Sequence, residues 1–226
     1  MNAERLLSSF LDLVAVESPS FHEAPMAALC ARLLADLGFA VEVDGSAEAT
    51  GSDTGNLIAR LPGTAPGRLA LAAHLDTVMP CAGIEVVREE AAAAGLGPAY
   101  EPDGPALEVL RSAGATILSA DDKAGIAAIL EGVRSAVEAG APRPDLTVLL
   151  TTCEEQSLLG ASALAEGALA WPADLASGFD DAPGGRPAPD APLPCYVLDA
   201  DGRPGTIITG APCHWTMAAE FSGRAA

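Results

Sequence analysis

With 226 residues, half of them hydrophobic but only 4% aromatic, the chain can bury one sizeable core built mainly from Ala, Leu, Val and Ile. Its 31 acidic residues against 12 basic ones give a formal net charge of -19, a field that repels phosphate and anionic lipid, so we expect neither nucleic acid nor membrane as a partner. No signal peptide is recognisable, and no apolar run approaches the length of a membrane span. The 5 scattered cysteines argue against disulfides and against a thiolate zinc site, and they favour a reducing, cytoplasmic compartment.

The first part of the chain predicts two helices and two strands. Hydrophobic residues at helical spacing predict a helix over residues 4–16. Ser20 and Glu23 have the spacing of a capping box, which predicts that a second helix opens there. Residues 40–43 and 56–61 then have the composition of strands.

The central part of the chain indicates the fold class. Residues 68–73 and 146–152 are nearly continuous apolar runs, which suit strands covered on both faces. Between them, a helix is predicted to begin at Asp122 or Lys123 and to end at residue 139. This order of elements predicts a layered α/β domain, a sheet with helices on both faces.

Several stretches lack this regularity. Residues 88–104 and 182–194 show no periodicity and are rich in Ala, Gly, Pro or Asp, so we interpret them as insertions or mobile loops. Nearer the end, residues 206–209 and 215–221 have the composition of strands, and the second would need partners that this chain does not supply.

Three polar clusters follow apolar strands or lie at strand-to-helix junctions, where open α/β sheets place their sites. They are His74 with Asp76, Asp121 with Asp122 and Lys123, and Glu154 with Glu155. Imidazole and carboxylate suit hard or borderline cations, and a pair of cations needs a carboxylate that bridges them. Asp76 lies on the same face of an extended segment as His74, where it can hold the second ring nitrogen.

Each cluster alone has a structural alternative. A His-x-Asp triplet usually serves the fold, Asp-Asp at a helix start is more often a cap, and Glu-Glu is usually a solvated first turn. Their joint occurrence, each after an apolar strand, favours a metal site over these alternatives.

Residues 72–78, 118–127 and 151–160 together resemble the co-catalytic dizinc metallopeptidases, a family that includes peptidase T, carboxypeptidase G and acyl-amino-acid deacylases. Residues 56–59 and 197–202 fit the same family, and the likeness covers nearly the whole chain in the family's order. The single lysine, Lys123, falls inside the Asp-Asp-Lys motif, and the chain looks closest to peptidase T-like members.

The resemblance implies a division into domains. Residues 1–210 would be a zinc-exopeptidase-like catalytic domain with an insertion at 182–194, and residues 211–226 would begin a lid or dimerisation domain. The chain would then be the N-terminal part of a longer protein, expected to be a homodimer. The final metal-binding histidine of the family would lie beyond residue 226.

The resemblance also implies roles for the clustered residues. His74 would bind one metal, Asp121 would bridge both, and Glu155 would bind the second. Glu154 would be the general base, and Asp76 would orient His74.

Two further residues have assignments of their own. Asp122 is interpreted as a cap of the helix that it opens. For the remaining metal ligand, Asp199 fits the local pattern of the family and is the expected residue, whereas Asp180 lies nearer the family's spacing and stays the alternative. A simple turn at residues 199–202 is a third possibility.

The activity that follows is metal-dependent hydrolysis of short peptides, tripeptide aminopeptidase-like, by water activated between two divalent ions. Zinc is the family's usual metal, and manganese or cobalt accept the same ligands. The alternatives are a carboxypeptidase or N-acyl-amino-acid deacylase of the same family, or an inactive fragment that keeps a metal site. Residues 1–226 alone are expected to be inactive or very weak.

Overall fold

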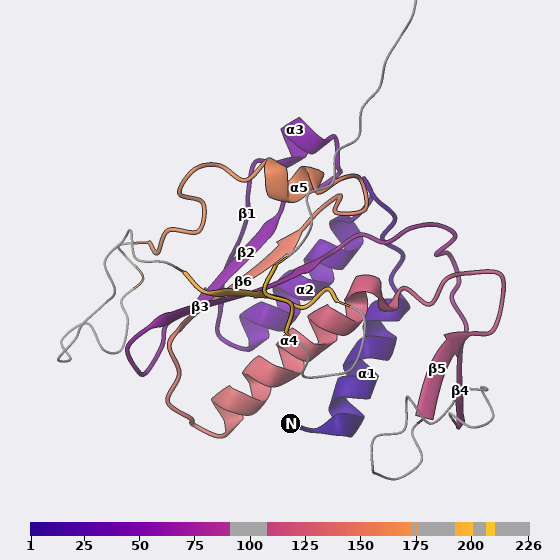
Figure 1. The fold of residues 1–226 in the computed structure, drawn as a ribbon, viewed down its shortest axis with the longest axis horizontal. Coiled ribbons are helices and arrows are strands. Elements are labelled where there is room, and N and C mark those ends of the chain that lie inside the picture. The colour runs from indigo at the N-terminus through magenta and orange to yellow at the C-terminus, as the bar shows by residue number, and fades with distance from the viewer. Residues whose placement is uncertain (91–107, 173–174, 176–192, 201–206, 211–226) are drawn as a thin grey trace, which may run out of the picture.

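The computed structural model describes residues 1–90, 108–172, 175, 193–200 and 207–210 (Figure 1). Its helices are α1 (Ala3–Val14), α2 (Ala24–Asp36), α3 (Ala47–Thr50), α4 (Ala120–Glu138) and α5 (Leu159–Ser162). Its strands are β1 (Ala40–Val43), β2 (Leu57–Leu61), β3 (Arg68–His74), β4 (Val86–Glu90), β5 (Glu108–Ser112), β6 (Asp145–Thr151) and β7 (Cys195–Val197). None of these helices is both long enough and apolar enough to cross a lipid bilayer.

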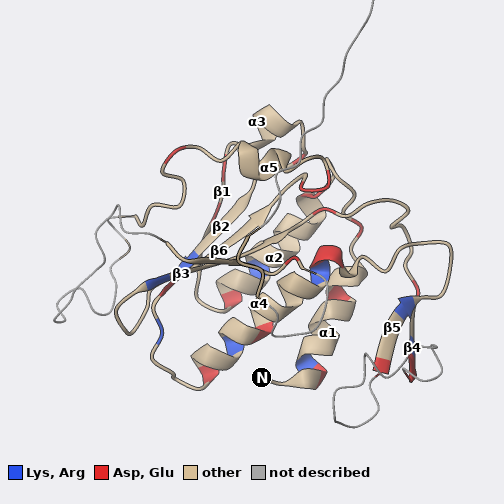
Figure 2. Cartoon of the chain, in the orientation of Figure 1, with Lys and Arg blue, Asp and Glu red and all other residues tan. Residues whose placement is uncertain are grey.

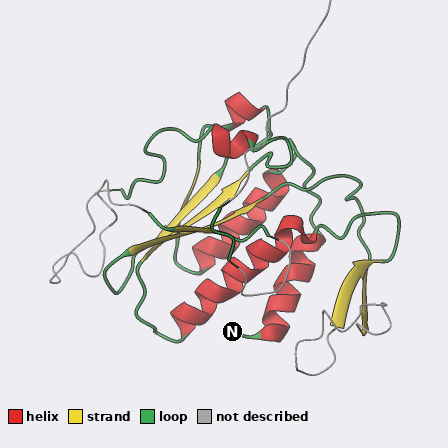
Figure 3. Ribbon diagram, in the orientation of Figure 1, coloured by secondary structure: helices red, strands yellow, loops and turns green. Residues whose placement is uncertain are grey.

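One mixed sheet organises the protein, with its strands in the order β1-β2-β6-β3-β7. β3 runs parallel to both β6 and β7, whereas β2 is antiparallel to β6 and to β1. His74 at the end of β3 pairs with Thr151 at the end of β6, so the chain leaves both strands at the same edge of the sheet. β4 and β5 form a separate antiparallel ribbon beside the main body (Figure 3).

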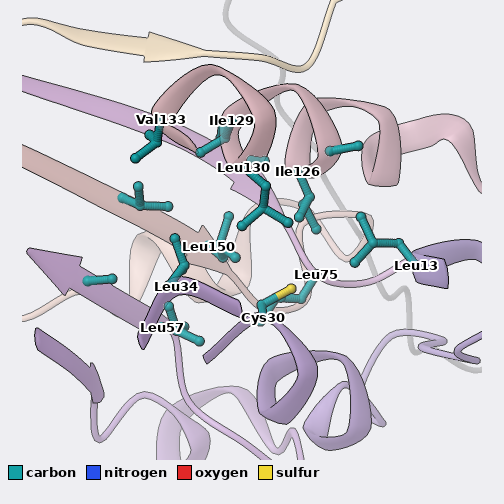
Figure 4. Packing of buried hydrophobic residues seen from close by; sticks show 14 of the residues in the cluster. Leu13, Cys30, Leu34, Leu57, Leu75, Ile126, Ile129, Leu130, Val133 and Leu150 are labelled. Atoms are coloured by element: carbon teal, nitrogen blue, oxygen red, sulfur yellow. The ribbon is translucent and has the colours of Figure 1, made fainter. Parts of the chain in front are cut away.

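The main core lies between the sheet and the three long helices α1, α2 and α4, which share one face (Figure 4). Alternate side chains of β6 point into it, because successive residues of a strand face opposite sides. α4 contributes apolar residues at a spacing of three and four, the pattern of a helix with one buried face. Residues packed here include Leu13, Cys30, Leu34, Leu57, Ile126, Ile129, Leu130, Val133 and Leu150.

The opposite face of the sheet has a smaller apolar cluster. Ile58, Ala72 and Leu149 are buried there. The covering side chains, Leu164 and Leu169, follow the short helix α5. The predicted layered α/β class is therefore confirmed, and within the described residues the long helices all lie on one side of the sheet.

The capping box predicted at Ser20 and Glu23 is wrong. α2 begins at Ala24, and the backbone N–H of Ala24 donates to the carboxylate of Asp53 at 2.8 Å. Glu23 makes no side-chain cap bond; its side chain is fully buried and its hydrogen bonds lie elsewhere in the fold. A local spacing that suits a cap cannot reveal a more distant partner.

Two other predictions also need correction. Residues 88–90, predicted to belong to an insertion or a mobile loop without regular structure, form the end of β4. Residues 207–209, predicted as a strand, have no regular secondary structure. Residues 91–104, 182–192 and 211–226, on which further predictions fall, lie outside the described residues.

Candidate functional site

The predicted site residues come together at the carboxyl edge of the parallel strands. His74 ends β3, Glu154 and Glu155 follow β6, and Asp199 follows β7. Asp121 lies at the start of α4, beside this edge. Figure 2 shows acidic segments of the chain at the start of α4 and in the neighbouring loops. Open α/β sheets bind their ligands at this edge.

His74 is the centre of the cluster and is only 2% exposed. Its Nδ1 lies 2.9 Å from the backbone oxygen of Asp76, so Nδ1 carries a proton and donates it to that oxygen. Its Nε2 lies 2.8 Å from Asp121 Oδ1, 3.9 Å from Asp199 Oδ2 and 4.0 Å from Glu154 Oε2. Nε2 therefore faces three carboxylates that come from three separate segments.

These donor atoms form two overlapping groups. One consists of His74, Asp121 and Asp199, and the other of His74, Glu154 and Glu155. Within each group the nitrogen and oxygen atoms all lie within 4.8 Å of one another. Imidazole and carboxylate are ligands that zinc, manganese and cobalt all accept, so the residues fit a divalent cation.

The electrostatics of the cluster also fit a cation. Burial raises the pKa of Glu154, Glu155 and Asp199, and other carboxylates nearby raise it further. For His74, burial lowers the pKa, but hydrogen bonds to Asp76 and Asp121 outweigh it and raise the pKa to about 10. The site thus concentrates more negative charge than its surroundings stabilise, which a bound cation relieves.

Asp76 contacts both His74 and the turn that carries Glu154 and Glu155. Its Oδ1 is 3.4 Å from His74 Nδ1, longer than the 2.9 Å from that nitrogen to the backbone oxygen of Asp76. Its carboxylate accepts the backbone N–H groups of Glu154 at 2.9 Å and Glu155 at 3.2 Å, and the hydroxyl of Ser20 at 2.7 Å. Burial raises the pKa of Asp76, but the hydrogen bonds to His74 and Ser20 outweigh it and lower the pKa. Asp76 therefore fixes both the imidazole and the turn of Glu154.

The two residues after Asp121 have structural contacts. Asp122 accepts the backbone N–H of Gly125 at 3.1 Å, as a cap does, and also the backbone N–H of His74 at 3.2 Å. Burial raises the pKa of Asp122 to about 8. Lys123 is buried and donates to the backbone oxygen of Val16 at 2.7 Å, which ties the start of α4 to the segment after α1.

Of the two residues considered for the last ligand, Asp199 lies in the cluster, and Asp180 lies outside the described residues. Ser20 and Asn56 have contacts at this edge that the sequence did not reveal. Ser20 had been assigned to a cap, and Asn56 accepts the backbone N–H of Thr152 at 3.1 Å. Both contacts join segments that are far apart along the chain.

The family model described as peptidase family M28 matches residues 56–180. Over its whole length the chain is 32% identical to the uncharacterized protein YqjE of Bacillus subtilis, of which it covers 51%. The structure of aminopeptidase PepT from Bacillus cereus matches 89% of the chain with a TM-score of 0.67 and 31% identity, and that of a tripeptidase from Staphylococcus aureus matches 89% with a TM-score of 0.66 and 28% identity. The chain covers 44% of each of these two structures and spans about half the length of the relatives it matches.

Proposed function

This chain belongs to peptidase family M28, and on that premise we propose that it is the metal-binding part of a peptidase that removes N-terminal residues from short peptides. The observation that carries the proposal is the meeting of His74 with carboxylates from three other segments at one edge of the sheet. The similarity to an aminopeptidase and to a tripeptidase supports this substrate class.

The proposal assigns two divalent cations, zinc in the first instance, to the cluster. His74 and Asp199 would hold one of them, Glu155 the other, and Asp121 would bridge the two. Bound there, the cations would lower the pKa of a water molecule and polarise the carbonyl of the peptide bond.

Glu154 is the proposed general base. Its Oε2 lies 4.0 Å from His74 Nε2, and its side chain is 26% exposed, so it borders both the cluster and the solvent. Burial raises the pKa of Glu154, which makes this carboxylate a better proton acceptor near neutral pH. Glu154 would take the proton of the attacking water and pass it to the amine that leaves.

The substrate class is tested on the full-length protein with zinc. We expect it to cleave an unblocked tripeptide, releasing the N-terminal residue first, and to leave an N-acetyl amino acid largely intact. Chromatography of the products at early times distinguishes the two ends of the peptide. Release of the C-terminal residue first, or faster cleavage of the N-acetyl amino acid, would instead support a carboxypeptidase or a deacylase.

A further inference from the structure

The turn that carries Glu154 and Glu155 is held by side chains from other parts of the chain. Residues 153–158 form no regular secondary structure. Yet four consecutive backbone N–H groups, those of residues 152–155, each donate to a side-chain oxygen at 2.9–3.2 Å. The acceptors are Asn56 for Thr152, Glu23 for Cys153, and Asp76 for Glu154 and Glu155.

Glu23 is the acceptor that the proposed chemistry does not otherwise explain. Its side chain is fully buried, and no Lys, Arg or His of the described residues lies within ion-pair distance of it. Instead its carboxylate accepts the hydroxyl of Ser52 at 2.5 Å, the N–H of Cys153 at 2.9 Å and the thiol of Cys153 at 3.3 Å. A buried carboxylate is unfavourable unless hydrogen bonds compensate, so its position requires these three donors.

Cys153 needs such an anchor because its backbone is unusual. Its φ is +50°, in the left-handed region that residues with a side chain adopt only when their surroundings hold them there. The two hydrogen bonds from Cys153 to Glu23 fix this conformation from both the backbone and the side chain. Cys153 directly precedes Glu154, so its conformation sets the direction in which the chain enters the turn.

We propose that Glu23 is a positioning residue for the general base, because it holds the left-handed turn at Cys153 that directs Glu154 toward the cluster around His74. This inference rests on the proposed peptidase function. Without Glu23, the backbone of Cys153 would relax toward an ordinary negative φ, and the carboxylate of Glu154 would move away from the position that proton transfer requires.

The test compares three variants of the full-length, zinc-loaded protein on a tripeptide. Glu23→Ala removes the acceptor, whereas Glu23→Gln keeps an amide oxygen that can still accept the N–H of Cys153. Asp53→Ala is the matched control, because Asp53 binds the first N–H of the same helix, α2, but has no hydrogen bond to the turn. For each variant kcat, KM, zinc content and Tm are measured.

We expect Glu23→Ala to lower kcat about 100-fold with KM within about twofold and zinc content unchanged, as for a misplaced catalytic group. Glu23→Gln should retain kcat within about fivefold, since a neutral hydrogen bond replaces a charge-assisted one. Asp53→Ala should lower Tm but leave kcat close to that of the unsubstituted protein.

Two results would overturn the inference. In one, Glu23→Ala and Asp53→Ala have the same kcat, which would make Glu23 a purely structural residue. In the other, Glu23→Gln loses as much activity as Glu23→Ala. Where Glu23→Ala does not fold, a fall of about 100-fold in the kcat of Glu23→Gln has the same meaning. If the unsubstituted protein hydrolyses no peptide, the proposed function itself is wrong, and this inference falls with it.

Discussion

Two acidic segments of the molecule, the turn at residues 153–158 and the ribbon of β4 and β5, are held in place by opposite means. The ribbon has a regular antiparallel backbone ladder, and its Arg–Glu pairs lie on the surface. The turn has no ladder. Its backbone donates to the buried side chains of Glu23 and Asp76, and the N–H of Thr152 directly before it donates to Asn56. The turn, which has no regular secondary structure, is thus fixed by buried hydrogen bonds. The ribbon, which has regular secondary structure, carries its ion pairs on the surface.

The difference matters because the two kinds of interaction have different strengths. A buried donor or acceptor that loses its partner costs about 1–3 kcal/mol, because water cannot replace the partner. An exposed ion pair is typically worth about 0–1 kcal/mol. Substitutions in the turn and its supports should therefore change both activity and stability, and those in the ribbon should change neither by much.

The largest expected effect comes from the turn itself. Glu154→Ala should lower kcat by about 1000-fold or more, because it removes the group that accepts the proton of water. Zinc content, measured by atomic emission, should stay nearly the same, since Glu154 is assigned as a base and not as a ligand. Loss of both metals in this variant would instead make Glu154 a ligand.

The next effect concerns the support beneath the turn. Asp76→Ala leaves the N–H groups of Glu154 and Glu155 without their acceptor and should lower the free energy of unfolding by about 3 kcal/mol. It should also weaken zinc binding about 10–100-fold, because the imidazole of His74 loses a neighbour that orients it. Urea unfolding and zinc titration measure the two effects. Ser20→Ala, which removes one hydrogen bond to the same carboxylate, is the control and should have a smaller effect on both.

An ion pair between α1 and α4 allows a buried carboxylate to be compared with an exposed one by varying the pH. Hydrogen bonds from Arg5 and from the backbone of Asn2 lower the pKa of Glu131 from 4.5 to about 2. Because the pKa is lower in the folded state, this contribution is fully present above about pH 4.5 and is lost as the pH falls toward 2. In the metal-free protein, the Tm difference from Glu131→Gln should therefore shrink over this range.

Glu138→Gln is the matched control for that measurement, because Glu138 binds the same Arg5 but is more than half exposed. Its Tm should follow that of the unsubstituted protein at every pH. A Tm difference for Glu131→Gln that stays constant from pH 7 to pH 2 would contradict the assigned ion pair.

The smallest effect is expected in the ribbon. Arg111→Ala removes the partner of Glu89 and should change the free energy of unfolding by less than about 1 kcal/mol, with kcat unchanged. A loss of activity comparable to that of Asp76→Ala would show that the ribbon supports the site, and the contrast drawn here would be wrong.

The sequence predicted those parts of the fold that depend on neighbours along the chain. The apolar runs at β3 and β6 are long enough to define buried strands, and the polar residues after them had to meet at one edge once the strands were parallel. His74, Asp121, Glu154, Glu155 and Asp199 accordingly lie together, although their roles as ligands and base stay predictions.

What the sequence did not reveal depends on partners far along the chain. Glu23 and Cys153 are 130 residues apart, so the spacing of Ser20 and Glu23 suggested a local cap instead of a contact across the fold. Similarly, Asp76 was predicted to orient an imidazole only, because its contacts with the backbone of Glu154 and Glu155 exist only in the folded sheet. Hydrogen bonds between distant segments leave no periodic pattern in the sequence.

The pairing of Val86 with Ser112 has a consequence for how such a protein can diversify. The ribbon departs from the chain and rejoins it at adjacent points, within the long connection that joins the neighbouring parallel strands β3 and β6. A segment whose two ends lie side by side can change in length or sequence without displacing β3 and β6, the strands before and after it. Val86 and Leu110 of the ribbon pack against the main core, so changes confined to its outward-facing residues would leave the edge that bears His74 in place.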